Sequence, residues 1–218
     1  VAVGAGAVTD ISGTEAQVSA VVDAGATITT AADYTSTLSD ADIDENELDD
    51  ILADTTGIVT ATSTGETAAA LVTALVRGDA ADALTLTIAA GAAAATDLTT
   101  LDGFTTVAVG GAAVTAINGT EAQVNAVVSA GATITTAADY TSTLSDGDID
   151  EDLLDDILAD TTGVVTATST GETAAALVTA LARGDAADAL TLTIAAGTET
   201  ATDLTTLDGF TTVAVGAG

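Results

Sequence analysis

The sequence contains no cysteine, histidine, lysine, methionine, proline or tryptophan, and only two basic residues, Arg77 and Arg183. Without cysteine no disulfide framework is possible, so the cysteine count does not indicate a redox compartment. Without histidine or cysteine, the usual general base and the most reactive nucleophile are both missing. Carboxylates are plentiful, but they lie in solvated acidic runs with no aromatic pocket to raise a carboxyl pKa. We therefore expect that the chain is not an enzyme.

Charge of one sign dominates the chain, with 33 acidic residues and a formal net charge of −31. Nucleic-acid binding needs a basic patch, which two arginines cannot build, and an anionic membrane surface would repel the chain. The longest apolar stretch, near residues 89–95, is too short to cross a bilayer. We therefore expect no nucleic-acid partner and no membrane insertion. The acidity favours solubility, cation binding and tolerance of salt.

Aromatic residues make up only 2% of the chain, although 48% of its residues are apolar. The apolar content is therefore mostly alanine, valine, leucine and isoleucine, which fill little volume per residue. Such residues suit a thin apolar layer between a sheet and a row of helices better than a deep globular centre. Because the apolar residues are periodic, we interpret the acidity as the surface charge of a folded protein and not as a sign of disorder.

The chain is built from two near-identical copies. Residues 1–106 and 107–212 align without a gap and differ at 14 positions. Residues 213–218 repeat the first six residues, VAVGAG, so we interpret them as the start of a third copy or an end-joining strand. Tandem copies of this kind indicate a repeat protein. Since the chain begins with valine and has no methionine, we expect a processed product or a piece of something longer.

Each copy shows four helical segments, in which apolar residues recur at i, i+3 and i+4. In copy one we expect helices near residues 13–24, 42–53, 66–77 and 96–102. Strands are expected at residues 27–30, 58–62, 84–89 and 106–109, with a further extended piece at 114–117. The third strand alternates with period two, so Leu84, Leu86 and Ile88 should face the helices and the threonines between them should face outward.

Strands and helices that alternate in this way imply right-handed crossover connections and a parallel sheet. We therefore predict an α/β protein, specifically a repetitive βα solenoid with a parallel sheet on one side and short helices on the other. The two copies should each contain four βα units. Neither end of the sequence shows a polar cap, and an exposed strand edge favours head-to-tail joining.

Aspartates at alternate positions precede the second helix of each copy. Oxygen ligands in this spacing suit a hard cation, so they are candidate Ca²⁺ ligands, and Ca²⁺ is the one cofactor we consider. The EF-hand pattern is not met, because its glycine and its terminal glutamate are both missing. Acidic residues also stabilise a helix N-terminus without any metal, and we favour that interpretation. The six candidates are Asp40, Asp42, Asp44, Asp146, Asp148 and Asp150.

Threonine pairs recur along the predicted strands. On a flat parallel sheet they would form rows of outward hydroxyl and methyl groups, similar to the ice-contacting faces of some solenoid antifreeze proteins. Threonine is also a common residue on any exposed sheet face, and we favour this simpler interpretation. The candidate face consists of Thr27, Thr29, Thr60, Thr62, Thr85 and Thr87 in copy one, and of Thr133, Thr135, Thr166, Thr168, Thr191 and Thr193 in copy two.

The tripeptide Arg77-Gly78-Asp79 and its copy at residues 183–185 match a known integrin-binding motif. A local explanation is available for every residue. Arginine suits a helix C-terminus, glycine ends the helix, and aspartate begins the next turn. We therefore favour a structural role for both tripeptides.

The segments GTEAQVSAVVDAGATITT, ADALTLTIAAG and ATDLTTLDGFTTVAV resemble the Ala/Thr/Asp-rich tandem repeats of very large secreted cell-surface proteins of marine bacteria and cyanobacteria, some of them adhesin-like. The resemblance covers essentially the whole chain. It implies export and a structural or adhesive role, and it transfers no catalytic residues. The Ca²⁺-binding nonapeptides that often accompany such repeats are absent here.

These observations predict a structural repeat module of an extracellular filament, sheath or surface layer. Its partner would be itself, in a head-to-tail homopolymer or a continuous array. One alternative is a stalk or ligand-binding segment of a large Ca²⁺-dependent adhesin. Another is the binding of ice or of a polysaccharide through the threonine-rich face.

Overall fold

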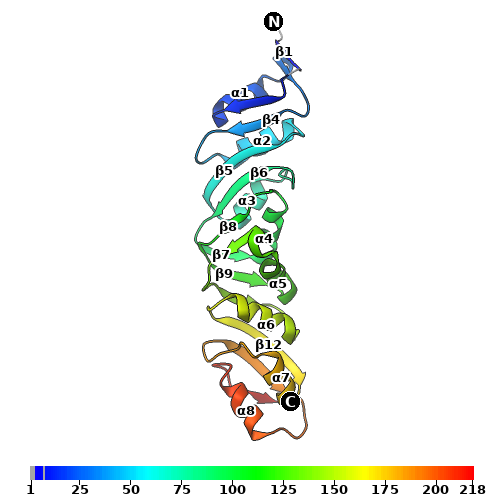
Figure 1. Cartoon of the computed structure of the whole chain (residues 1–218), viewed down its shortest axis with the longest axis vertical. Coiled ribbons are helices and arrows are strands. Elements are labelled where there is room, and N and C mark those ends of the chain that lie inside the picture. Colours follow the sequence, from blue (N-terminus) through cyan, green and yellow to red (C-terminus); the bar gives the residue numbers. More distant parts are fainter. Residues whose placement is uncertain (1–2, 7) are drawn as a thin grey trace. The chain divides into compact units, whose positions relative to one another are not determined.

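The protein is an α/β protein in which two all-parallel six-stranded sheets alternate with helices. The computed structural model describes residues 3–6 and 8–218, and Figure 1 labels many of its elements. A two-stranded parallel ribbon of β1 (Val3–Ala5) and β3 (Ile28–Thr30) accompanies the two sheets. The prediction of an α/β chain with parallel strands is therefore confirmed.

The chain divides into two compact units that interleave in the sequence. Unit 1 consists of the described residues up to Ala90 together with Asp97–Ala113 and Ala132–Thr135. Unit 2 consists of Gly91–Thr96, Val114–Gly131 and Thr136–Gly218. The units therefore do not coincide with the two sequence copies, because unit 1 draws segments from the start of copy two.

Unit 1 contains a six-stranded sheet in the order β10-β8-β6-β5-β4-β2. Helix α1 packs on α2 and α2 packs on α3, so the helices also follow one another in chain order. The strands are β2 (Asp10–Gly13), β4 (Thr35–Leu38), β5 (Val59–Glu66), β6 (Ala83–Ile88), β8 (Val109–Gly111) and β10 (Ile134–Thr136, whose last residue falls in unit 2). The helices are α1 (Glu15–Ala24), η1 (Gly25–Thr27), α2 (Glu45–Asp54), α3 (Ala68–Ala74) and most of α4 (Ala95–Asp102).

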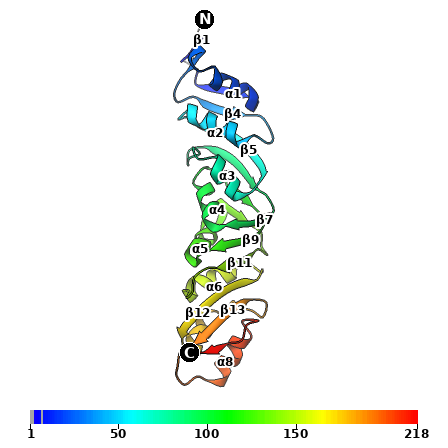
Figure 2. The ribbon, with the colours of Figure 1, turned by 180° about the vertical axis from the view of Figure 1, so that it is seen from behind.

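Unit 2 repeats this arrangement with a sheet in the order β14-β13-β12-β11-β9-β7, and Figure 2 shows β11, β12 and β13 side by side. Its helices α5 to α8 also pack on one another in chain order. The strands are β7 (Gly91–Ala94), β9 (Val114–Gly119), β11 (Thr141–Leu144), β12 (Val165–Glu172), β13 (Ala189–Ile194) and β14 (Gly216–Ala217). The helices are α5 (Glu121–Ala130), η2 (Gly131–Thr133, whose last residues fall in unit 1), α6 (Glu151–Asp160), α7 (Ala174–Ala180) and α8 (Ala201–Asp208).

Local capping sets the ends of the helices, which lie close to the predicted ranges. The Asp44 carboxylate accepts hydrogen bonds from the first backbone N–H groups of α2, and the Thr67 hydroxyl does the same for α3. At α5, Thr120 and Gln123 form a reciprocal capping box. These polar side chains satisfy N–H groups that have no partner within the helix, so they fix where each helix begins.

The core consists of buried side chains from both the strands and the helices. Leu84, Leu86 and Ile88 are buried, whereas Thr85 and Thr87 between them are exposed, so the predicted alternation of β6 is confirmed. Leucine and isoleucine side chains of α2, α3 and α4 are also buried. Tyr34 is fully buried as well, which the sequence pattern did not predict.

Buried threonine hydroxyls join segments that are distant in the sequence. The Thr55 hydroxyl donates to the carbonyl oxygen of Tyr34 at 2.5 Å and accepts from the N–H of Gly57 at 2.9 Å. Thr105 likewise donates to the carbonyl oxygen of Leu84 at 2.8 Å. The two bonds to carbonyl oxygens each link residues 21 positions apart, so a buried hydroxyl connects one strand–helix stretch to the next.

Gly57 marks a point where two such stretches approach each other too closely for any side chain. A β-carbon at this position would lie 2.3 Å from the carbonyl oxygen of Tyr34 and 2.6 Å from that of Asp33. A β-carbon at Gly147, by contrast, would have no neighbour within 4 Å. Copy one already carries alanine at the corresponding position, Ala41.

We expect Gly57→Ala to lower the free energy of unfolding by about 1–3 kcal/mol, because the backbone must shift to accept the methyl group. Gly147→Ala is the matched control and should stay within about 0.5 kcal/mol of the parent chain. Urea denaturation followed by circular dichroism measures both values. Equal stability of the two variants would contradict the close approach at Gly57.

Candidate functional site

The structure brings part of the predicted threonine face together. Parallel pairing places Thr62 beside Thr85 on β5 and β6, and Thr64 beside Thr87. In unit 2 the same pairing places Thr168 beside Thr191. The side chains between them on these strands, such as Ser63 and Leu84, are buried, whereas these threonines are exposed or half-buried. The outer face of each sheet therefore carries short rows of threonine hydroxyl and methyl groups.

These rows are narrow. Thr60 lies beside Ala83, and Thr87 lies beside Gly110, so the threonine rows stop after a strand or two. Thr166 of copy two lies in the same way beside Ala189. A binding surface made of these rows would therefore be interrupted by residues that lack a hydroxyl group.

The remaining threonine candidates lie elsewhere. Thr27 and Thr133 are exposed but belong to the short 3₁₀ turns η1 and η2, because the strands that follow begin one residue later. Thr29 lies in β3 opposite Gly4, and Thr135 donates its hydroxyl hydrogen to the carbonyl oxygen of Val109. Four threonines that the sequence pattern missed extend the rows, and a longer period-two window would have found them: Thr37, Thr64, Thr143 and Thr170, with Thr193 as the partner of the last.

The three candidate calcium ligands of copy one each bind backbone N–H groups, and these groups belong to three different elements. Asp40 accepts from the N–H of Glu15 in α1 at 2.5 Å, and Asp42 accepts from Thr64 in β5 at 2.8 Å. Asp44 caps α2. The acidic run therefore ties a helix, a strand and the start of the next helix together, in addition to favouring the helix dipole.

Copy two repeats this arrangement. Asp146 accepts from the N–H of Glu121 at 2.5 Å, Asp148 accepts from Thr170 at 2.7 Å, and Asp150 caps α6. Among the residues that the structure describes, no group of three or more acidic side chains is arranged to hold a metal ion. The geometry thus gives all six aspartates a backbone-bonding role, and calcium binding stays a prediction.

Glu121 is an unusual carboxylate that the sequence pattern did not single out. It is only 7% exposed, its Oε2 accepts from the N–H of Asp150 at 2.9 Å, and its Oε1 is buried without a hydrogen-bond partner. Burial raises the pKa of Glu121, and the neighbouring carboxylates of Asp150, Asp146 and Glu151 raise it further against the opposing effect of the Asp150 N–H. Glu121 meets the acidic run only in the fold, 25–29 residues along the chain, so no local sequence signal reveals its burial.

Asp82 and its counterpart Asp188 are two further buried carboxylates with a raised pKa, and burial is the main cause in both. Asp82 accepts from the N–H of Val59 at 2.8 Å and from that of Asp79 at 3.2 Å. It therefore holds the start of β5 against the turn before β6. These contacts explain the burial without any catalytic role.

The Arg-Gly-Asp tripeptide is engaged within the fold. Arg77 forms an ion pair with Asp49 of α2, and its backbone N–H also donates to Asp49. Asp79 accepts from the N–H of Ala81 at 2.7 Å, which closes the turn before β6. The predicted turn at Asp79 is therefore confirmed, whereas the predicted place of Arg77 at a helix C-terminus is wrong, because α3 ends at Ala74 and Arg77 pairs with Asp49 of α2 instead.

No family model matches the chain, and no curated protein or solved structure is similar enough to match it. In the part of the chain that the structure describes, none of the helices has the length and apolar character needed to span a bilayer.

The raised carboxyl pKa values predict that acid stabilises the fold. A carboxyl group whose folded-state pKa lies above its ordinary value binds its proton more tightly when folded. Its stabilising effect is complete below the ordinary value, 4.5 for Glu121, and is lost as the pH rises through the raised pKa. The melting temperature should therefore rise when the pH falls from 7 towards 4.5.

Glu121→Gln tests this explanation, because the amide keeps an acceptor for the Asp150 N–H and cannot ionise. We expect its melting temperature to exceed that of the parent chain at pH 7, with a difference that shrinks towards pH 4.5. Glu15→Gln is the matched control in copy one, where the glutamate is half-buried and the effect should be smaller. A difference that does not change with pH would refute the role of ionisation.

Proposed function

We propose that this chain is a structural repeat module of an extracellular filament, sheath or surface layer, and that it assembles head-to-tail with further copies. The observation that carries this proposal is that the boundaries of the sheets do not coincide with the boundaries of the sequence copies. The sheet of unit 1 begins with β2, β4, β5 and β6 of copy one and ends with β8 and β10 of copy two. Each copy thus supplies the strands that complete the sheet of the copy before it.

The two-stranded ribbon of β1 and β3 also corresponds to strands that complete a sheet. In the gapless alignment, residues 3–5 of β1 correspond to β8 and residues 28–30 of β3 correspond to β10. The ribbon is therefore equivalent to the last two strands of a six-stranded sheet. A chain in which every sheet is completed by a neighbouring copy is suited to a continuous array.

We further propose that the successive strand–helix stretches are coils of a βα solenoid, with strands on one side and short helices on the other. Three features support this arrangement. The neighbours in each sheet follow chain order, all the pairings are parallel, and consecutive helices pack on each other. Side-chain hydrogen bonds between residues 20–29 positions apart join one stretch to the next.

Export is supported by the acidic, lysine-free composition and by the resemblance to the repeats of secreted surface proteins. Carboxylates such as Asp44, Asp82 and Asp150 serve caps and turns, which fits a structural role. The in-register threonine pairs favour binding of ice or of a polysaccharide as a second candidate. We place it second because the rows are narrow.

The net charge of −31 predicts that assembly depends on salt. Like-charged copies repel each other at low ionic strength, where the Debye length is about 30 Å at 0.01 M, and are screened at 1 M, where it is about 3 Å. We expect sedimentation velocity to show small species in dilute buffer and longer oligomers in 1 M NaCl, which electron microscopy should show as fibres or elongated rods.

A CaCl₂ series at matched ionic strength is the control for the adhesin-stalk alternative. Assembly that follows ionic strength alone supports the proposed structural module. Assembly that needs Ca²⁺ would favour the calcium-dependent stalk. A monomer under all of these conditions would overturn head-to-tail assembly.

A further inference from the structure

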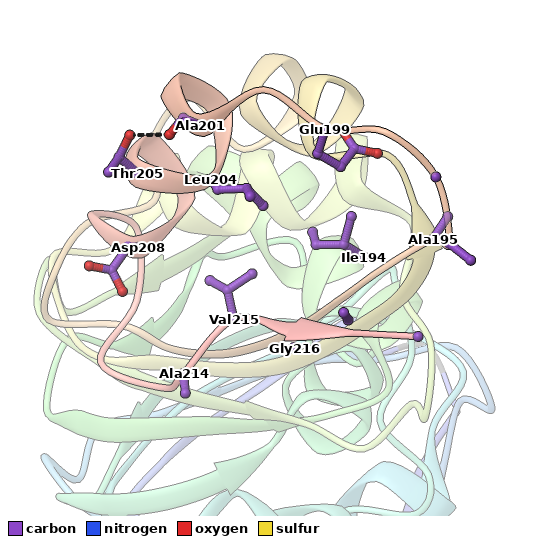
Figure 3. Close-up of a pocket in the computed structure, with 14 residues that line it drawn as sticks. Ile194, Ala195, Glu199, Ala201, Leu204, Thr205, Asp208, Ala214, Val215 and Gly216 are labelled. Atoms are coloured by element: carbon purple, nitrogen blue, oxygen red, sulfur yellow. Dashed lines mark hydrogen bonds between the residues drawn. The ribbon is translucent and has the colours of Figure 1, made fainter.

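An apolar groove of about 850 Å³ lies in unit 2 beside α8 and β14. Figure 3 shows Ile194, Leu204 and Val215 directed into it from β13, α8 and the segment before β14. Leu204 is 39% exposed, whereas its counterpart in copy one, Leu98, is fully buried. The same leucine is thus covered in one copy and open in the other.

Residues 197–200 form the rim of this groove and are not paired with a neighbouring strand. Residues 197–200 are not a strand, although the corresponding residues of copy one form β7. Within unit 2, β7 pairs with β9 so that Gly91 lies opposite Val114 and Ala92 lies opposite Ala116. The structure therefore contains the pairing that residues 197–200 would make if a segment equivalent to β9 were present.

The segment equivalent to β9 is β2 with the two residues before it, Val8 and Thr9, and its surface is also incompletely covered. β2 is the edge strand of unit 1, whereas β9 has a neighbour on each side. Val8 is 40% exposed, and its counterpart Val114 is 1% exposed. Ile11 and Val21 are half-buried, whereas their counterparts in copy two are fully or almost fully buried.

We infer that the groove binds residues 8–24 of a second copy of this chain, which form β2 and α1. In this interface β2 pairs with residues 197–200 as β9 pairs with β7, so that Val8 lies opposite Gly197 and Asp10 lies opposite Thr198. Val8 and Ile11 of one copy then cover the groove around Leu204 of the other. The inference rests on the proposed head-to-tail assembly and gives it a register.

The interface also predicts a strand exchange. Gly216-Ala217 of β14 is identical to Gly4-Ala5 of β1 and corresponds to part of β8. In unit 1, β8 lies beside β10, and in the ribbon β1 lies beside β3. On docking, β14 of one copy therefore takes the place of β1 beside β3 of the next. When β14 replaces β1, the strand pairing that is broken and the strand pairing that is formed are equivalent. The exchange therefore costs little free energy and is an accessible route to assembly.

A pair of introduced cysteines tests the register, because the chain has no cysteine of its own. Opposed residues on paired strands lie about 4.8 Å apart, within the range of about 4.4–6.8 Å that a disulfide spans. In 1 M NaCl with mild oxidant, Asp10→Cys/Thr198→Cys should give a ladder of disulfide-linked oligomers that reductant abolishes. Asp10→Cys/Thr200→Cys, in which the second cysteine is two residues out of register, is the matched control. It should give several-fold less disulfide-linked oligomer.

The outcomes separate this inference from the proposed function. Oligomers in sedimentation without a register-specific ladder would overturn the interface and leave the structural module standing. Equal ladders from both cysteine pairs, or an intrachain disulfide, would also overturn the interface. Absence of oligomers under every salt condition would overturn the proposed assembly and the interface together.

A second variant tests the groove itself. Leu204→Asp should abolish the oligomers in 1 M NaCl and leave the circular dichroism spectrum unchanged, because the side chain is partly exposed in the single chain. Val76→Asp adds the same charge at a position that is 63% exposed and outside the groove, and it should assemble like the parent chain. Normal assembly of Leu204→Asp would overturn the inference.

Discussion

Parallel strand pairing between successive strand–helix stretches is the interaction on which the structure depends. Within each unit, neighbouring strands of the sheet come from adjoining stretches, and no antiparallel hairpin occurs among the described residues. With few aromatic residues, a single stretch buries little apolar volume by itself. Its leucines and valines become a core only when the next stretch is laid beside it, which is the energetic basis of repeat proteins.

Polar side chains reinforce this pairing where the apolar layer is thin. Thr55 and Thr105 connect a turn to the carbonyl oxygen of an earlier stretch, and Asp82 holds two backbone N–H groups. Asp40 and Asp42 bind N–H groups of different elements. A large share of the negative charge is thus used to satisfy backbone donors, which water would otherwise have to reach.

Because the two copies are nearly identical, the exposure of a residue in one copy can be compared with that of its counterpart in the other copy. Val8 and Val114, or Leu204 and Leu98, are the same residue at equivalent positions of the two copies, and they differ in exposure. The local sequences are similar but not identical, since residues 92–94 are alanines where residues 198–200 are Thr-Glu-Thr. The positions that are more exposed gather beside β2 in unit 1 and beside residues 197–200 in unit 2. This asymmetry is the physical basis for the interface between copies that we infer.

The sequence by itself determined the repeat, the positions of the helices and the inward face of β6. Those features arise from local signals, namely apolar periodicity, capping residues and the alternation of leucine with threonine. The roles of Asp44 and Asp150 as helix caps were likewise predictable, because the cap and the helix are contiguous in sequence.

Only the tertiary structure decided which strands share a sheet and which carboxylates are buried. The four-residue strands β4 and β7 went unpredicted because four small or polar residues carry no clear signal, and they become strands through their neighbours. Glu15 and Glu121 have almost the same local sequence, yet only Glu121 is buried. Burial and sheet membership depend on residues some 20 or more positions away, and local sequence patterns do not contain that information.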